Sequence, residues 1–498
     1  MRRLLPLVLA LVSIAHTASA YDQPVHEWLS RRGYGGPAQL DDDPAQAQAA
    51  VDALRRRVYR AGANATDPAL RARFLARYPD EAQFDARAWK RFLMLNPDKR
   101  VAGLDETPLP TGRVGADLYA LASRLPDDDE RNRERYRHGT DGAVQKDAWG
   151  RPLPDDPAAL EMGGLAGLSS QAHAHYQLPA LQFSDDPDVL KRDPRRFAIP
   201  PTVHTFGAEM AESYTLLALL AARLPAGARL SVVLAGAAAH HIEDTANQIH
   251  TVQVGLYDFF VDATLEAYKR ELASIGGLVG AHPTRNEIGI QIISNHHTLL
   301  EALFKKHLLI EGDPVRTAAE RAPGDPAFTA ALDAIPSGCT PGFAHALVMQ
   351  LAEQSSREGP TVYAEIRKAA DRRWSRAGAV YEPATDDPDA ALHAAADLNR
   401  FFELEVRGVG RSDEALRAWW RRTTACATAG VDSDTIIAEQ LIATRLATLD
   451  AIDARAAAYA PKPPATARIT WWVPALYAGL LALLALIVRR VRRRRRAR

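Results

Sequence analysis

Residues Leu230–His250 read LSVVLAGAAAHHIEDTANQIH. The first half of this stretch, residues 230–239, is largely apolar and alanine-rich without a proline, which is typical of a buried helix and predicts one over 230–244. His240 and Asp244 stand four residues apart, so on a helix they share one face, with Cβ atoms about 5–6 Å apart. An imidazole and a carboxylate placed in this way can bind one metal ion.

Other long stretches of the chain follow the same pattern, and alternating β-branched runs are scarce. Further helices are expected over Phe206–Leu224, Asp258–Ile275, Glu287–Leu309, Gly342–Ser356, Ser412–Thr423 and Asp434–Ala457. Ser412 followed by Glu414 is typical of a helix start. Residues 126–160 and 178–203, rich in Asp, Pro and Arg, are expected to be long loops. We therefore predict an all-α fold, a helical bundle with long loops.

The first 20 residues have the pattern of a secretory signal peptide. Arg2 and Arg3 form a charged start, Leu4–Ala15 is apolar, and Ala18-Ser19-Ala20 is a small-residue cleavage site. The apolar stretch is short for a membrane anchor. Cleavage before Tyr21 and export of the following domain are therefore expected.

The other end of the chain has the pattern of a membrane anchor. Residues 469–488 carry no charge over 20 positions and start with Ile469, which at roughly 1.5 Å per residue spans one hydrocarbon core. The arginine-rich tail 489–498 is expected to stay in the cytoplasm, where it could also contact anionic lipid. The proline-rich segment 461–468 is expected to be a short linker. The sequence thus predicts a single-pass membrane protein with an exported body.

The net charge of zero hides an uneven distribution. Two basic residues lie in the first 20 positions and eight arginines lie in 469–498, which leaves 51 basic against 61 acidic residues between them. A body with a net charge of −10 is a poor binder of polyanions such as double-stranded nucleic acid. A phosphate-bearing substrate would need a locally positive site.

Cysteines and the common catalytic motifs indicate little. Cys339 and Cys426 are the two cysteines of the sequence, and export would allow them to pair. A thiolate metal cluster is excluded because no C-x-x-C pair exists. The nucleophile elbow, the P-loop and the dinucleotide glycine fingerprint are also absent from the sequence.

A second histidine–carboxylate pair repeats the spacing of the first. His297 and Glu301 are again four apart, on the helix expected over Glu287–Leu309. His250 follows Asp244 by six residues, where the helix should have ended. Imidazole and carboxylate ligands without thiolate suit zinc in a catalytic site. Taken alone, such a pattern also fits hydrogen-bonded core or cap residues.

Residues 240–250 resemble the central motif of the zinc-dependent phospholipase C family, whose fold is shared with single-strand-specific zinc nucleases of fungi and plants. The resemblance covers roughly residues 21–310. It implies an exported all-α domain with three zinc ions, one of them bound by the amine and carbonyl of the mature N-terminal residue.

By this resemblance, each candidate ligand has a role. Tyr21 would supply the amine and carbonyl, and His26 would be its partner. Asp244 would bridge two ions, with His240 on one of them. The third ion would be held by His250, His297 and Glu301. His241 and His296 adjoin the expected ligands His240 and His297. If the motif is placed one position off, His241 would replace His240, or His296 would replace His297.

Two further ligands are expected upstream. His175, in the segment HAHYQLP over 173–179, resembles the histidine of the family's H-F-Y-D-P segment; alternatively, His173 and His175 are loop histidines without a ligand role. Asp127 is the expected aspartate, with Asp128 and Asp129 as alternatives. Asp127 could also accept a proton from an attacking water.

The chain departs from the family in several places. Tyr21 replaces the usual tryptophan, and the separations from Asp127 to His175 and from His250 to His297 are longer than usual. The carboxylate ligand expected for the third ion is Glu301 rather than an aspartate, and this difference favours a phospholipase over a nuclease.

The resulting domain prediction has six parts. They are a signal peptide (1–20), a phospholipase C-like domain (21–315), a helical extension (316–460), a linker (461–468), a transmembrane helix (469–488) and a basic tail (489–498). The expected activity is zinc-dependent hydrolysis of a phosphodiester, most simply a phospholipid head group. The alternatives are a single-strand nuclease or nucleotidase and a non-catalytic anchored scaffold. The oligomeric state is left open.

Overall fold

The computed structural model describes residues 23–40, 47–94, 115–126, 175–178, 206–251, 285–335, 341–376, 379, 381, 383, 386–427 and 433–458. Secondary structure in these residues is helical, apart from one isolated bridge between Ala370 and Leu392. The α-helices are α2 (Gln23–Gly33), α3 (Ala47–Ala63), α4 (Pro68–Arg77), α5 (Ala86–Phe92), α6 (Gly115–Ala122), α10 (Gly207–Ala222), α11 (Ala228–Ala246), α13 (Arg285–Leu309), α14 (Pro314–Glu320), α15 (Pro326–Asp333), α16 (Phe343–Ser355), α17 (Gly359–Ala369), α18 (Asn399–Ala427) and α19 (Ser433–Ala458). Short 3-10 helices are η4 (Gln248–Thr251), η5 (Arg372–Ser375) and η6 (Asp389–Ala391). The predicted all-α class is confirmed for these residues.

Five expected helices are confirmed to within a few residues, namely α10, α11, α13, α16 and α19. The expected helix start at Ser412 is wrong, because α18 already begins at Asn399. Phe401, Leu404 and Val409 are fully buried at helical spacing, so the chain upstream of Ser412 gains stability as a helix. Ser412 is itself buried in the middle of α18.

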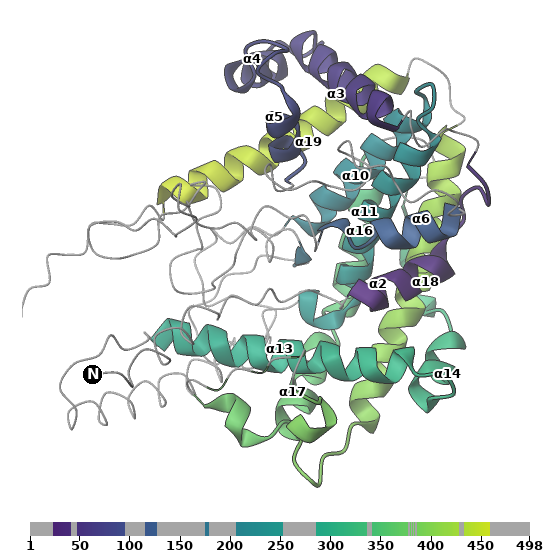
Figure 1. The fold of residues 1–498 in the computed structure, drawn as a ribbon, viewed down its shortest axis with the longest axis vertical. Helices are drawn as coiled ribbons and strands as arrows, with labels where there is room; N and C mark the ends of the chain where they lie inside the picture. Colours follow the sequence, from purple (N-terminus) through teal and green to yellow (C-terminus); the bar gives the residue numbers. More distant parts are fainter. Residues whose placement is uncertain are drawn as a thin grey trace, which may run out of the picture. The chain divides into compact units, whose positions relative to one another are not determined.

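The central part of the fold is built on α10 and α11, which pack against each other (Figure 1). Nearly every side chain of both helices is buried, because α11 also contacts α6, α16, α18 and α2. Trp419 of α18 donates a hydrogen bond from its indole nitrogen to Oγ1 of Thr215 on α10 at 2.9 Å. Helices before and after residue 315 therefore share one core, and the described residues up to Ala456 form one compact unit.

A second apolar cluster surrounds α13. It joins Val25 and Leu29 of α2, Ile249 of η4, and residues of α13, α17 and α18 such as Phe304. α11 belongs to the first cluster, through Ile242 among others. The segments that carry the predicted ligands thus come from both clusters.

Several short helices begin with aspartate caps. Asp67, Asp313 and Asp325 each accept a backbone hydrogen bond at the start of α4, α14 and α15, and each precedes a proline. The N-terminus of α16 is capped differently, since Glu212 of α10 accepts hydrogen bonds from three of its backbone amides.

Several predictions fall outside the described residues. They concern the signal peptide 1–20, Tyr21, the aspartates 127–129, the loops 126–160 and 178–203 except at their described ends, the helix 258–275, the linker 461–468, the segment 469–488 and the tail 489–498. Among the described residues, no helix is both long and apolar enough to cross a membrane. Cys426 is disulfide-bonded, and Cys339, the other cysteine of the sequence, is not among the described residues.

Candidate metal centre

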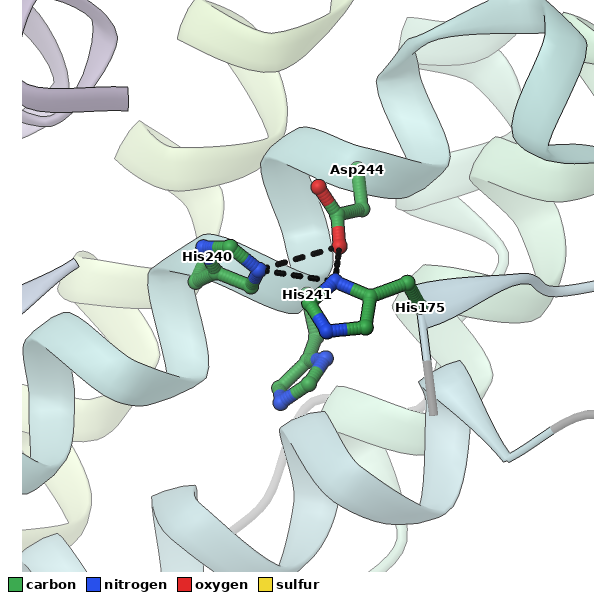
Figure 2. Close-up of side chains that lie close together, drawn as sticks. All are labelled: His175, His240, His241 and Asp244. Atoms are coloured by element: carbon green, nitrogen blue, oxygen red, sulfur yellow. Dashed lines mark hydrogen bonds and ion pairs between the residues drawn. The ribbon is translucent and has the colours of Figure 1, made fainter. Parts of the chain in front are cut away.

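Asp244, in the last turn of α11, is fully buried and faces three histidines. Its Oδ2 lies 2.5 Å from Nδ1 of His175 and 3.2 Å from Nε2 of His240 (Figure 2). Its Oδ1 lies 3.3 Å from Nε2 of His26. The two oxygens of one carboxylate therefore face different imidazoles, from elements far apart in the sequence.

The orientation of His240 is set by the end of α6. Its Nδ1 lies 2.7 Å from the carbonyl oxygen of Ser123, which can only accept a hydrogen bond, so Nδ1 carries the proton. Nε2 consequently faces Asp244 and Nδ1 of His175, which lies 2.9 Å away. A backbone carbonyl that fixes the tautomer in this way is typical of a metal-binding histidine.

Glu243 fixes the orientation of His26. Nδ1 of His26 donates to Oε2 of Glu243 at 2.6 Å, and Oγ of Ser30 donates to Oε1 at 2.6 Å. The Nε2 atom of His26 is thereby directed at Asp244. The rings of His26 and His240 stack with centroids 4.1 Å apart. All of these side chains are fully buried.

A second group consists of His250 on η4 with His297 and Glu301 on α13. Nε2 of His297 lies 2.8 Å from Oε1 of Glu301 and 3.1 Å from Nε2 of His250. Oε1 of Glu301 is 4.0 Å from Nε2 of His250. His250 can take part because α11 ends at Ala246 and the chain turns into η4.

The short segment 175–178 lies between the two groups. His175 belongs to the first group, and the next residue, Tyr176, stacks on His250 with centroids 4.3 Å apart. The hydroxyl of Tyr176 lies 3.4 Å from Nδ1 of His297. The backbone amide of Gln177 donates to the carbonyl of His250 at 3.0 Å. One stretch of chain thus positions residues of both groups.

The charges of these groups depend on burial and on their neighbours. Burial opposes protonation of His26, but Asp244 and Glu243 outweigh it and raise its pKa to about 10. Burial acts to raise the pKa of Asp244, yet the imidazoles of His240 and His175 hold that pKa well below its ordinary value. Burial and the neighbouring His297 hold the pKa of His250 well below its usual range.

These donors fit zinc. Both groups offer imidazole nitrogens and carboxylate oxygens, buried and without thiolates, which is a donor set that zinc accepts. Candidate ligand atoms of His175, His240, His241 and Asp244 lie within 4.8 Å of one another, and the same holds for His250, His297 and Glu301. Nε2 of His240 and Oδ2 of Asp244 converge on the same point as Nδ1 of His175 (Figure 2). Two buried groups of the described chain can therefore hold metal ions.

The structure brings together seven of the nine predicted ligands, in two sets: His26, His175, His240 and Asp244, then His250, His297 and Glu301. Tyr21 and Asp127 lie outside the described residues. His296, the alternative to His297, bonds instead to the hydroxyls of Tyr363 and Ser375, each at 3.2 Å.

Sequence reasoning missed Glu243, Ser30 and Ser123, which position the histidines rather than face the group. The sequence carried one signal for Glu243. It is a second carboxylate beside Asp244, in a helix that is mostly apolar and has no solvent-facing side. A buried carboxylate in such a helix requires a buried partner. The carbonyl of Ser123 carries no side-chain signal at all.

Comparisons with known proteins add no relative. No protein-family model, no curated protein and no solved structure matches this chain significantly.

Proposed function

We propose that this protein is an exported, membrane-anchored, zinc-dependent phosphodiester hydrolase that acts on phospholipid head groups. The observation that carries the proposal is the carboxylate of Asp244, which faces His26 with one oxygen and His175 and His240 with the other. A carboxylate so placed can bridge two ions. The second group, with Glu301, would hold a third.

Zinc ions held at these residues would bind phosphate oxygens, stabilise the charge of the transition state and lower the pKa of a bound water. They would also supply the positive field that a phosphodiester needs near a body whose net charge is −10 by the count of residues 21–468.

The chain's own residues prepare this site. The carbonyl of Ser123 and the carboxylate of Glu243 engage Nδ1 of His240 and of His26, so that Nε2 is the nitrogen of each ring that would face a bound ion. Asp244 stays ionised although it is buried, because the imidazoles of His240 and His175 hold its pKa well below its ordinary value. Asp127 is proposed as the proton acceptor on the basis of the family resemblance.

The choice of a lipid substrate rests on two features of the sequence. The predicted anchor at 469–488 would hold the domain beside a bilayer. The acidic body disfavours a long polyanion such as nucleic acid. Glu301 agrees with the phospholipase side of the family resemblance.

The test uses the full-length protein in detergent micelles. Zinc per chain is measured by elemental analysis, and hydrolysis is followed on phosphatidylcholine vesicles and on a single-stranded oligonucleotide. We expect about three ions per chain and lipid hydrolysis, both reduced in Asp244→Asn. The matched control is Asp413→Asn, a buried aspartate that pairs with Arg32, which should keep its zinc.

Each other result has a definite meaning. No zinc in the wild type, after zinc has been offered, contradicts the metal centre. Zinc and hydrolysis that both persist in Asp244→Asn contradict its assignment. Cleavage of the oligonucleotide without cleavage of lipid would replace the lipid by nucleic acid as substrate.

A further inference from the structure

His241 is a fully buried histidine whose ring makes no hydrogen bond to any residue that the structure describes. It follows His240 on α11, and its exposed fraction is 0%. Within the described part of the chain, neither Nδ1 nor Nε2 has a hydrogen-bond partner. A neutral imidazole carries one donor and one acceptor. A buried polar group left in this state requires an explanation, such as a bound ion.

The surroundings of His241 place it beside the first metal group. Its ring lies 5.4 Å from the ring of His175 and 5.2 Å from that of His240, measured between centroids. One of its ring nitrogens lies within 4.8 Å of the ligand atoms of His175, His240 and Asp244. Figure 2 shows the His241 ring next to that of His175.

Tyr214 of α10 holds the His241 ring on its other side. The two rings stack with centroids 5.8 Å apart and an interplanar angle of 11°. This contact fixes the plane of the imidazole without using either nitrogen. A metal ligand needs an ordered ring with one available nitrogen, and His241 meets this requirement.

His296 shows that a core histidine of this fold can be satisfied without metal. Like His241, it is fully buried and adjoins a residue of a metal group, here His297. Both of its nitrogens have hydroxyl partners, on Tyr363 and Ser375. The lack of partners at His241 is therefore specific to that position.

We propose that His241 is a further ligand of the ion that His175, His240 and Asp244 hold. This inference rests on the proposed zinc centre. The described residues would then give that ion three imidazoles and one carboxylate, a set that selects zinc over the oxygen-preferring Mg²⁺ and Ca²⁺. Ligand atoms of one tetrahedral zinc ion lie roughly 3.3–3.5 Å apart, and a small movement of the ring covers the difference.

His241→Phe tests this, since it keeps a ring against Tyr214 and removes both nitrogens. Two properties of the full-length protein are measured: zinc affinity, by competition with a chelator of known affinity, and thermal unfolding of the zinc-free form. We expect one ion to bind at least tenfold more weakly. We also expect the zinc-free variant to melt no lower than the wild type, because two unsatisfied atoms are gone.

The matched control is His296→Phe. It should melt at a lower temperature than the wild type, because the hydroxyls of Tyr363 and Ser375 lose their partner, yet it should bind zinc with unchanged affinity. If His241→Phe does not fold, His241→Gln serves in the same measurement.

Zinc affinity unchanged in the His241 variant that folds would overturn the inference while leaving the zinc centre intact. A wild-type protein that binds no zinc would overturn the proposed function itself. The two failures are therefore distinguishable in one titration series.

Discussion

His26 and Glu243, 217 positions apart in the sequence, are joined by a buried hydrogen bond of 2.6 Å. Oγ of Ser30 donates a hydrogen bond to the other carboxylate oxygen of Glu243. Both oxygens of Glu243 are therefore fixed in place. When a carboxylate accepts a hydrogen bond from one ring nitrogen of a histidine, the other ring nitrogen becomes a stronger metal ligand and its direction is fixed. Glu243 is therefore a positioning residue for the proposed centre.

Glu243→Gln should weaken binding of one zinc ion by about 10–100-fold. The amide keeps the shape of the side chain but loses the charge that orients His26. Chelator competition on the full-length protein measures the affinity, and the second group should be unaffected.

Glu212→Gln is the control for this change, because Glu212 is also a buried glutamate and caps α16. It should lower thermal stability and leave zinc affinity alone. Equal zinc affinities in Glu243→Gln and the wild type would show that His26 needs no such support.

Glu301→Gln should remove one ion and spare the others. Glu301 contributes the carboxylate of the second group, 2.8 Å from His297, and an amide oxygen is a much weaker zinc ligand. Elemental analysis should find about one ion fewer per chain.

The control lies on the same helix. His307 pairs with Asp313 at 2.9 Å, away from the second group, so His307→Asn should retain the wild-type zinc content. A full complement of zinc in Glu301→Gln would remove Glu301 from the centre.

Gly236→Ala should destabilise the fold although alanine favours helices. A Cβ at this position would lie 2.6 Å from Cβ of Ala122 and 2.6 Å from the carbonyl of Tyr119, where α11 crosses α6. We expect a loss of about 1–3 kcal/mol in the free energy of unfolding, measured by denaturant unfolding. Zinc affinity should fall as well, because α6 leads into Ser123, whose carbonyl holds His240.

At Gly324 the nearest neighbour of an added Cβ is the carboxylate at the end of the Glu414 side chain, 3.2 Å away. Gly324→Ala should therefore change neither the free energy of unfolding nor the zinc affinity measurably. A Gly236→Ala protein as stable as the wild type would mean that α6 can move without cost.

Glu405 should make stability depend on pH. It is fully buried on α18, and neither oxygen has a hydrogen-bond partner among the described residues. Burial, opposed by Arg411 and helped by Glu358, raises its pKa from 4.5 to about 8. A carboxyl with a raised pKa in the folded state binds its proton more tightly there. Its contribution to stability is complete below pH 4.5 and is lost as the pH rises through 8.

Glu405→Gln removes this dependence, because the amide stays neutral. In the zinc-free protein, the variant should melt close to the wild type at pH 5 and a few degrees above it at pH 8.5. Circular dichroism during heating measures both. Parallel melting curves across this range would mean that Glu405 is ionised or solvated in the folded protein.

Local pattern was enough to predict the helices whose apolar residues recur at helical spacing with no proline between them. α10, α11 and α13 are of this kind. The four-residue spacing from His240 to Asp244 also predicted that these two side chains lie on one face of α11. α18 was predicted too short, because the Ser412 pattern was interpreted as a cap. In the structure, Ser412 lies between buried turns, and tertiary packing decides where the helix begins.

The contacts between distant segments could not be predicted from periodicity. Nothing in the local pattern around His26 indicates that it meets Glu243 and Asp244, since that contact depends on how α2 packs on α11. The family resemblance paired His26 with Tyr21, in the same three-zinc cluster as Asp244. It assigned no role to Glu243 or to the Ser123 carbonyl, which are visible only in three dimensions.

The packing of α2 on α18 has a consequence for the order of events during synthesis. His26 is made early, but Gly33 of its helix lies against Leu416, nearly 400 residues later. The proposed centre therefore depends on contacts of very long sequence separation, which form late in folding. A nascent chain would carry scattered histidines with little affinity for metal, and tight binding would begin only when the last helices are in place. Retention of zinc would then report that the chain has finished folding.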